Sequence, residues 1–271
     1  MNHVHLIQAA CSKLQSISIS PESDALMLME ALVPEARQAY LARQSIPLNT
    51  IQTQQWHAWI ERRLQGEPVA MILGYCYFWG LKIQVNQKTL IPRRETEHLV
   101  QHALETIKTI KKPSLIDLGT GSGAIACALA HERPDCHLIA IDQSDAALKV
   151  AQANGTTHRC GQIQYVKNDW LSDWTETEKV DCIISNPPYI PTETISTLQI
   201  DVCQYEPSIA LDGGPDGLFF YKYLLKTGPS MLKKSGEMIL EIGFDQQVEL
   251  TELQDDFPEW TSSTFLPDLQ G

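Results

Sequence analysis

Apolar positions recur at helical spacing through the first quarter of the chain. Residues 20–32 and 51–65 both carry apolar side chains at the period of an amphipathic helix. In the second segment Trp56 and Trp59 fall on the apolar side, and a stripe at this spacing is more typical of a buried core than of a binding surface. We therefore predict a helical domain over residues 1–73.

The pattern then changes from helical spacing to short β-type runs. Residues 75–85 are aromatic and β-branched, and Gly80 interrupts them as in a short hairpin. This predicts a β-hairpin linker over residues 74–94. A helix is expected after it, from about residue 95 to residue 112.

From Pro113 onward, short apolar runs alternate with amphipathic segments. This order is typical of an α/β domain, here expected over residues 95–271, with a Rossmann-like, mostly parallel sheet and helices on both faces. Such sheets bind ligands beyond the carboxyl ends of their strands. The strands are expected at residues 114–118, 137–142, 163–166, 180–185, 237–242 and 261–266.

A glycine-rich loop follows the first of these strands and opens a helix. Its residues Gly119, Gly121 and Gly123 allow sharp turns and let a ligand approach the main chain closely. Asp142 stands at the end of the next strand, where a carboxylate can accept hydrogen bonds from both hydroxyls of a ribose. These features indicate a ribose-bearing cofactor, although the loop alone also fits the fingerprint of an NAD-dependent oxidoreductase.

The tetrapeptide Asn186-Pro187-Pro188-Tyr189 follows the fourth strand and distinguishes between these cofactors. Two prolines fix the backbone and remove two N–H donors, which leaves the Asn186 side-chain amide and the Pro187 carbonyl as acceptors. Together they can hold both hydrogens of a planar NH2 group while Tyr189 lies against its plane. The nitrogen lone pair would then point at an electrophile such as a sulfonium methyl group. Because both acceptors interact more strongly as the nitrogen becomes positive, the tetrapeptide indicates methyl transfer to nitrogen.

The sequence also resembles known proteins in these motifs. The segments DLGTGSG (117–123) and NPPYI (186–190) look like those of amino-methylating class I S-adenosylmethionine-dependent methyltransferases. More narrowly, the chain resembles the HemK/PrmC family, the peptide chain release factor glutamine N5-methyltransferases. That narrower resemblance is carried by RRLQGEPVA (62–70), LIPRRETE (90–97) and EPSIALDGGPDGL (206–218).

The resemblance implies a small N-terminal helical domain that binds substrate and a methyltransferase domain joined to it through the hairpin. It implies S-adenosyl-L-methionine as the cofactor, S-adenosyl-L-homocysteine as its product, and the Gly-Gly-Gln glutamine of class 1 peptide chain release factors as the acceptor. The cofactor-binding positions would be Gly119, Thr120, Gly121, Ser122, Gly123, Asp142, Asp169, Trp170 and Asn186. The glutamine-binding positions would be Asn186, Pro187, Pro188 and Tyr189, with the catalytic role assigned to Asn186, Pro187 and Tyr189.

Three features depart from the family pattern or extend it. Arg94 stands where the family usually has Pro, and Tyr77 where it usually has Glu. The family's sheet continues with an antiparallel strand beside the fifth strand, so here we expect an unpaired sheet edge. Residues 190–217 form a long connection, which we expect to act as a lid near the substrate.

The composition limits the alternatives. With 21 Lys and Arg against 33 Asp and Glu, the net charge of −12 argues against bulk-charge binding of nucleic acid. It therefore disfavours the main alternative, an N6-adenine nucleic-acid methyltransferase, whereas a cofactor-binding module without catalysis stays open. No apolar run approaches the roughly 18 residues of a membrane span. We expect a cytoplasmic monomer that binds release factors and no metal, nucleic acid or membrane.

Overall fold

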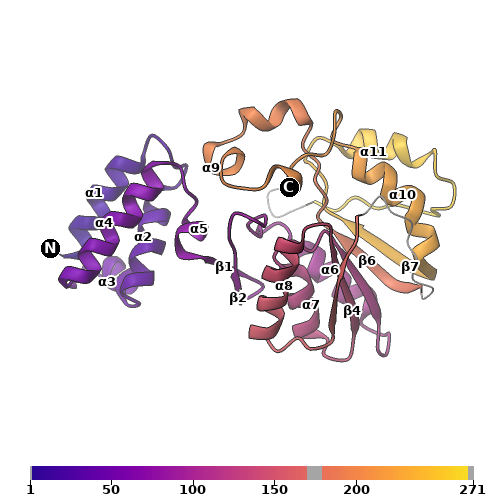
Figure 1. Ribbon diagram of the computed structural model, residues 1–271, viewed down its shortest axis with the longest axis horizontal. Coiled ribbons are helices and arrows are strands. Elements are labelled where there is room, and N and C mark those ends of the chain that lie inside the picture. Colours follow the sequence, from indigo (N-terminus) through magenta and orange to yellow (C-terminus); the bar gives the residue numbers. More distant parts are fainter. Residues whose placement is uncertain (1, 170–178, 268–271) are drawn as a thin grey trace. The chain divides into compact units, whose positions relative to one another are not determined.

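The computed structural model describes residues 2–169 and 179–267, which divide into two compact units. The first unit comprises residues 1–75 together with residues 199–205. The second comprises residues 76–198 and 206–271. Both units are coloured along the chain in Figure 1.

The first unit is a group of helices around one apolar core. Trp56 is 2% exposed and Trp59 packs against the same cluster, so this tryptophan stripe belongs to the core. A capping box between Asn49 and Gln52 starts the helix that carries both tryptophans. The helices are α1 (His3–Leu14), α2 (Pro21–Leu32), α3 (Ala36–Leu41), α4 (Thr50–Leu64), α5 (Val69–Leu73) and α9 (Ile200–Cys203).

A buried arginine connects α4 to both α2 and α9. Arg63 is 4% exposed, its Nε donates to Asp24 Oδ2 at 2.7 Å, and its Nη2 lies 3.6 Å from Asp201 Oδ2. Gly66 has a φ of +92°, and a Cβ there would lie only 2.8 Å from Ile200 Cγ2. The short α9 segment is therefore packed closely into the helical unit.

The second unit contains a five-stranded parallel sheet. Its spatial order is β5-β4-β3-β6-β7, so β3 lies in the centre and the chain builds outward from it in both directions. The first five predicted strands are all present, which confirms the α/β, Rossmann-like fold. Their bounds are β3 (Ser114–Leu118), β4 (His137–Asp142), β5 (Ile163–Lys167), β6 (Val180–Ser185) and β7 (Leu232–Leu240).

Helices cover both faces of this sheet (Figure 1). The helices α6 (Glu97–Ile107), α7 (Ala124–Glu132) and α8 (Asp145–Thr157) lie beside one another, and α10 (Phe219–Met231) contacts α11 (Gln247–Gln254). Ile116 and Leu118 pack in one cluster with Leu224 of α10, whereas Asp117, between them in β3, accepts a hydrogen bond from Ala126 N–H of α7. This alternation places α7 and α10 on opposite faces.

The predicted hairpin precedes the sheet and consists of β1 (Tyr75–Phe78) and β2 (Leu81–Gln84). Trp79 and Gly80 connect the two strands with φ values of +51° and +73°. Positive φ at both central positions is what a two-residue turn of type I′ requires.

The structure corrects one sequence expectation. Residues 261–266 form no strand, so the predicted sixth strand is wrong; four of these six residues are Thr or Ser and offer little apolar surface to bury against a sheet. Within the described residues, β7 is therefore an edge strand. The long connection over residues 190–217 contains the 3₁₀ helices Thr192–Thr197 and Ser208–Ala210 in addition to α9.

Every helix within residues 2–169 and 179–267 is too short or too polar to span a lipid bilayer.

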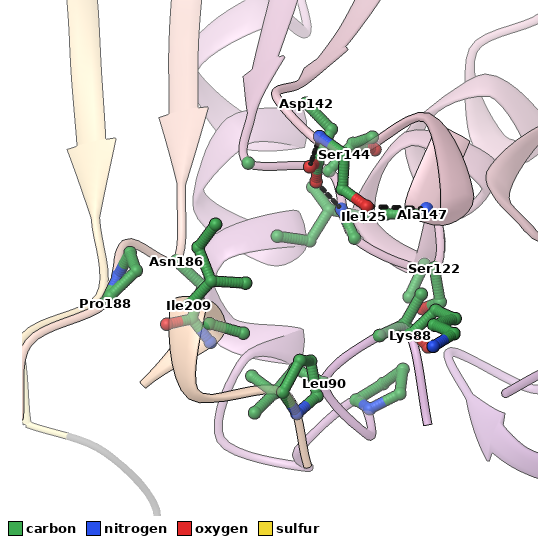
Figure 2. A pocket seen from close by; sticks show the side chains of 18 of the residues that line it. Lys88, Leu90, Ser122, Ile125, Asp142, Ser144, Ala147, Asn186, Pro188 and Ile209 are labelled. Atoms are coloured by element: carbon green, nitrogen blue, oxygen red, sulfur yellow. Dashed lines mark hydrogen bonds between the residues drawn. The ribbon is translucent and has the colours of Figure 1, made fainter. Parts of the chain in front are cut away.

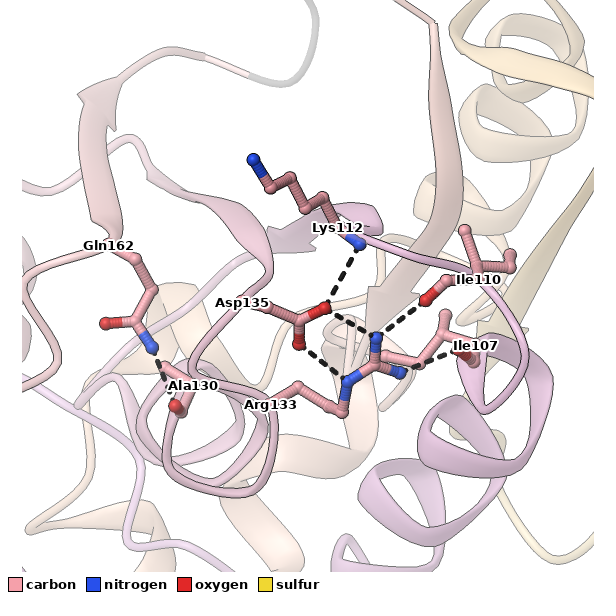
Figure 3. A network of polar contacts seen from close by, with 7 residues as sticks. All are labelled: Ile107, Ile110, Lys112, Ala130, Arg133, Asp135 and Gln162. Atoms are coloured by element: carbon pink, nitrogen blue, oxygen red, sulfur yellow. Dashed lines mark hydrogen bonds and ion pairs between the residues drawn. The ribbon is translucent and has the colours of Figure 1, made fainter.

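An arginine holds together the loops at the amino end of β3 (Figure 3). Arg133 Nη1 and Nη2 donate to the carbonyls of Ile107 and Ile110, each at 2.7 Å. Carbonyls at a helix end lack partners within the helix, so this arginine caps α6. The same guanidinium contacts the Asp135 carboxylate at 2.9 Å and 3.1 Å and lowers the pKa of Asp135 to about 2.

Replacing Arg133 by alanine should lower the free energy of unfolding by about 1–2 kcal/mol, because two carbonyls lose their charged donor. The control Lys111→Ala, at an exposed position between α6 and β3, should change it by less than about 0.5 kcal/mol. Urea unfolding followed by circular dichroism measures both values. Equal stability of the two variants would contradict the capping role of Arg133.

Candidate active site

An open cavity lies beyond the carboxyl ends of β3, β4 and β6 (Figure 2). About 820 Å³ of space lies between its walls, and this figure includes space that is open to solvent. After β3 the chain continues to β4 on one side, and after β6 it continues to β7 on the other. Doubly wound sheets bind ligands at such a reversal of strand order. The parallel register pairs Leu118 with Ser185, so the glycine loop and Asn186 leave the sheet side by side.

Most of the predicted site residues meet at this cavity. Its lining includes Gly119, Thr120, Gly121, Ser122, Asp142, Asn186 and Pro188. Gly123, Asp169, Pro187 and Tyr189 are described by the structure but do not line it, and Asp169 is exposed. Trp170 lies outside the described residues.

The glycines of the loop serve different purposes. Gly119, Gly121 and Gly123 have φ values of +70°, +55° and +78°. A Cβ on Gly123 would lie 2.9 Å from the Cβ of Ala151 in α8, whereas the nearest atom to a Cβ on Gly121 is 3.9 Å away. Gly123 therefore permits close packing of the loop on α8, and Gly121 leaves open space where a ligand can approach the backbone.

Asp142 lies across the cavity from Asn186 (Figure 2). Its Oδ2 accepts a hydrogen bond from Gly121 N–H at 2.9 Å, and its Oδ1 accepts one from Ser144 N–H at 2.8 Å. Burial raises the pKa of Asp142, and these backbone donors oppose the shift. Each carboxylate oxygen has room for a further hydrogen bond, so the pair can accept from two adjacent hydroxyls.

Asp117 is a buried acid beneath the loop that the sequence analysis did not assign to the site. Its side chain is fully buried, and its Oδ2 accepts hydrogen bonds from Thr120 Oγ1 at 2.6 Å and Ala126 N at 3.2 Å. Its Oδ1 has no partner among the described residues. Burial raises the pKa of Asp117 to about 7. An acid inside an apolar strand, directly before the glycines, was the signal that could have revealed it.

Asn154 supports the loop from the side of α8. This fully buried amide donates to the Ser122 carbonyl at 2.8 Å and to the Gln84 carbonyl at 3.0 Å, and it accepts from Gln84 N–H at 2.8 Å. The hairpin strand β2 and the glycine loop are thus held by one side chain.

The Asn186 side chain belongs to a partly buried polar network on the other side of the cavity. Asn186 Nδ2 donates to Thr96 Oγ1 at 3.1 Å, and Thr96 Oγ1 donates to Glu241 Oε2 at 2.6 Å. The Tyr189 hydroxyl donates to Glu241 Oε1 at 3.4 Å. Sequence reasoning missed Thr96 and Glu241 as site residues. The signal for Glu241 was an acid directly after a strand, at the same sheet edge as Asp142.

The end of the long connection forms one wall of the cavity. Glu206 is buried, accepts a hydrogen bond from Ile91 N–H at 3.1 Å and forms an ion pair with Arg93. This anchor fixes the start of the segment that reaches the cavity. The cavity-lining residues that follow it are Pro207, Ile209 and Ala210.

These residues fit a nucleoside cofactor. Asp142 keeps acceptor capacity for ribose hydroxyls, and Gly121 leaves the backbone accessible. Asp142 lines the cavity, whereas Asp117 is buried beneath the loop, where burial disfavours its ionised form.

Comparisons with known proteins extend this result. Residues 5–74 match the family model of the PrmC N-terminal domain, and residues 95–201 match that of the methyltransferase small domain. A release factor glutamine methyltransferase from Coxiella burnetii (strain RSA 493 / Nine Mile phase I) is 37% identical over 89% of this chain and 86% of its own length. The one from Escherichia coli (strain K12) is 38% identical over 91% of this chain and 87% of its own length.

A solved structure supports the fold alone. The hMettl16 catalytic domain, in complex with the MAT2A 3'UTR hairpin 1, has a TM-score of 0.56 at 15% identity. The match covers 84% of this chain and 81% of that chain.

The fold, the glycine loop and these matches define an S-adenosylmethionine-dependent methyltransferase of class I. Its similarity to the curated relatives is high over almost the whole length. The chain belongs to the release factor glutamine methyltransferase family.

Changing Asp142 to alanine should weaken binding of S-adenosylhomocysteine by about 10- to 100-fold, because the ribose hydroxyls and the Gly121 N–H lose their acceptor. The control Asp145→Ala removes a nearby exposed acid whose ion pair with Lys167 is solvated, and it should leave affinity unchanged. Isothermal titration calorimetry measures both. Wild-type affinity in Asp142→Ala would remove this residue from the cofactor site.

Proposed function

We propose that this protein transfers a methyl group from S-adenosylmethionine to the side-chain N5 of the glutamine in the Gly-Gly-Gln motif of class 1 peptide chain release factors. The observation that carries the proposal is the emergence of Asn186 beside the glycine loop, at paired strand ends, in a member of this family. The protein acts in the cytoplasm, as a monomer, without direct contact to nucleic acid or a membrane.

The cofactor is assigned to the glycine-loop side of the cavity. Residues 119–123 receive its methionine part, Asp142 its ribose and Asp169 its adenine. Support comes from the open space at Gly121 and from the spare acceptor capacity of Asp142. When bound, S-adenosylmethionine supplies an electrophilic methyl group on a sulfonium.

The glutamine amide is assigned to the Asn186 side. Asn186 Oδ1 and the Pro187 carbonyl accept its two hydrogens, the two prolines keep that corner rigid, and Tyr189 limits the tilt of the amide plane. An amide nitrogen is a poor nucleophile because its lone pair is delocalised. Two acceptors on its hydrogens favour a pyramidal nitrogen, and they interact more strongly as that nitrogen becomes positive. The excess proton leaves after methylation, so no side chain has to remove it beforehand.

An N6-adenine nucleic-acid methyltransferase would use the same tetrapeptide on an aryl NH2 group. The net charge of −12 supports the protein substrate instead, because nucleic-acid binding depends on clustered cations.

Mass spectrometry of a class 1 release factor tests the substrate directly. After incubation with this protein and S-adenosylmethionine, we expect the mass of one added methyl group on the peptide that contains Gly-Gly-Gln. DNA and RNA oligonucleotides, incubated in parallel, should stay unmodified. An unmodified release factor, with protein that still binds S-adenosylhomocysteine, would overturn the proposed function.

Asn186→Ala should lower kcat for release factor methylation by at least about 100-fold, because one of the two acceptors on the reacting nitrogen is lost. The affinity for S-adenosylhomocysteine should stay within a few-fold of wild type, which is the opposite pattern to Asp142→Ala. Single-turnover methylation and calorimetry separate the two effects. Unchanged turnover would show that Asn186 does not hold the glutamine.

A further inference from the structure

We infer that Thr96 and Glu241 determine which end of the Asn186 amide faces the acceptor, and that they thereby make the site select a carboxamide over a carboxylate. Both are positioning residues, since they act through Asn186. The inference rests on the proposed function, in which Asn186 accepts a hydrogen of the substrate amide.

Three side chains from separate elements form the chain of hydrogen bonds. Asn186 follows β6, Glu241 follows β7, and Thr96 directly precedes α6. Thr96 is 4% exposed and also lines the cavity, so water has little access to the bond between Thr96 and Glu241. The donor–acceptor distances are 3.1 Å from Asn186 Nδ2 to Thr96 Oγ1 and 2.6 Å from Thr96 Oγ1 to Glu241 Oε2.

The direction of this chain follows from what each group can donate. An ionised carboxylate only accepts, so the single hydroxyl hydrogen of Thr96 is committed to Glu241. The oxygen of Thr96 then offers only lone pairs to Asn186 and must receive a hydrogen from it. The Nδ2 end of the amide therefore faces Thr96, and Oδ1 is the end left for a ligand. The two ends have nearly the same shape, so these partners decide the orientation.

The groups around Glu241 shift its pKa in both directions, with a net shift upward. Burial raises the pKa of Glu241, and the nearby acid Glu95 acts in the same direction. Hydrogen bonds from Thr96, Tyr189 and Asn186 oppose this shift because they stabilise the ionised form. The carboxylate thus receives donors from both ends of the tetrapeptide and from the residue before α6.

This orientation bears on which side chain the site accepts. Glutamine and glutamate have nearly the same shape, but glutamine presents an NH2 group where glutamate presents a second oxygen. Oδ1 of Asn186 is a partner for the NH2 group and repels the carboxylate oxygen. A reversed Asn186 amide would donate to the carboxylate and leave the Pro187 carbonyl as the one remaining acceptor proposed for the glutamine nitrogen. Fixing the amide therefore favours the substrate that can be methylated.

The test uses Thr96→Val, which keeps the side-chain volume and removes the hydroxyl, with Thr96→Ser as the matched control that keeps it. The substrate is an intact class 1 release factor, and the competitor is the same factor with glutamate in place of the Gly-Gly-Gln glutamine. In the wild type we expect the inhibition constant of the glutamate form to be at least about 100-fold higher than the dissociation constant of the glutamine form. In Thr96→Val we expect this ratio to fall at least about 10-fold and kcat to fall by a similar factor, with wild-type values in Thr96→Ser.

Binding of S-adenosylhomocysteine shows whether each variant is folded. If Thr96→Val fails to bind S-adenosylhomocysteine, Glu241→Gln is tested in place of Thr96→Val. A carboxamide at position 241 can donate to Thr96, and this permits the hydrogen bonds between residues 241, 96 and 186 to run in the opposite direction. Wild-type selectivity and kcat in the folded variant would overturn the positioning role alone. A wild-type protein that methylates neither form would overturn the proposed function and this inference with it.

Discussion

The parallel pairing of β3 with β6 is the constraint on which the site depends. It pairs Leu118 with Ser185, so the next residues along each strand, Gly119 and Asn186, leave the sheet together. The fully buried Ser185 hydroxyl donates to the Leu118 carbonyl at 2.7 Å, which adds a bond specific to this register. A shift of one residue would turn the side chains of β6 to the opposite faces. The glycine loop and the Asn186 corner, to which we assign the cofactor and the amide, are therefore brought together by the sheet rather than by loop geometry.

The two sides of the cavity are supported in different ways. On the cofactor side, backbone conformation dominates: positive φ values in the glycine loop, two backbone N–H groups on Asp142, and one buried amide, Asn154, beneath Ser122. On the acceptor side, side chains dominate, since Thr96 and Glu241 hold Asn186 from two different elements. A rigid backbone suits the binding of a cofactor that is the same in every turnover. An amide side chain held in one orientation suits the recognition of a single NH2 group.

Site residues that stand next to a strand in the chain can be predicted from the sequence, whereas residues that meet only through the folded structure cannot. The glycine loop, Asp142 and the tetrapeptide each follow a strand, so hydrophobic patterning was enough to bring them to one edge of the sheet. Thr96 and Glu241 are separated by 145 residues and have meaning only once α6 and β7 are folded beside β6. The strand predicted at residues 261–266 is absent, because four of its six residues are Thr or Ser and offer little apolar surface to bury against the sheet.

A crystal structure with S-adenosylhomocysteine and a glutamine-containing Gly-Gly-Gln peptide tests the central claim most directly. The account predicts that both ligands occupy the cavity, with the glutamine nitrogen within about 3.2 Å of Asn186 Oδ1 and of the Pro187 carbonyl. It also predicts that Thr96 still bonds the opposite end of the Asn186 amide. A glutamine nitrogen held by other groups, or an Asn186 amide whose nitrogen faces the peptide, would contradict it.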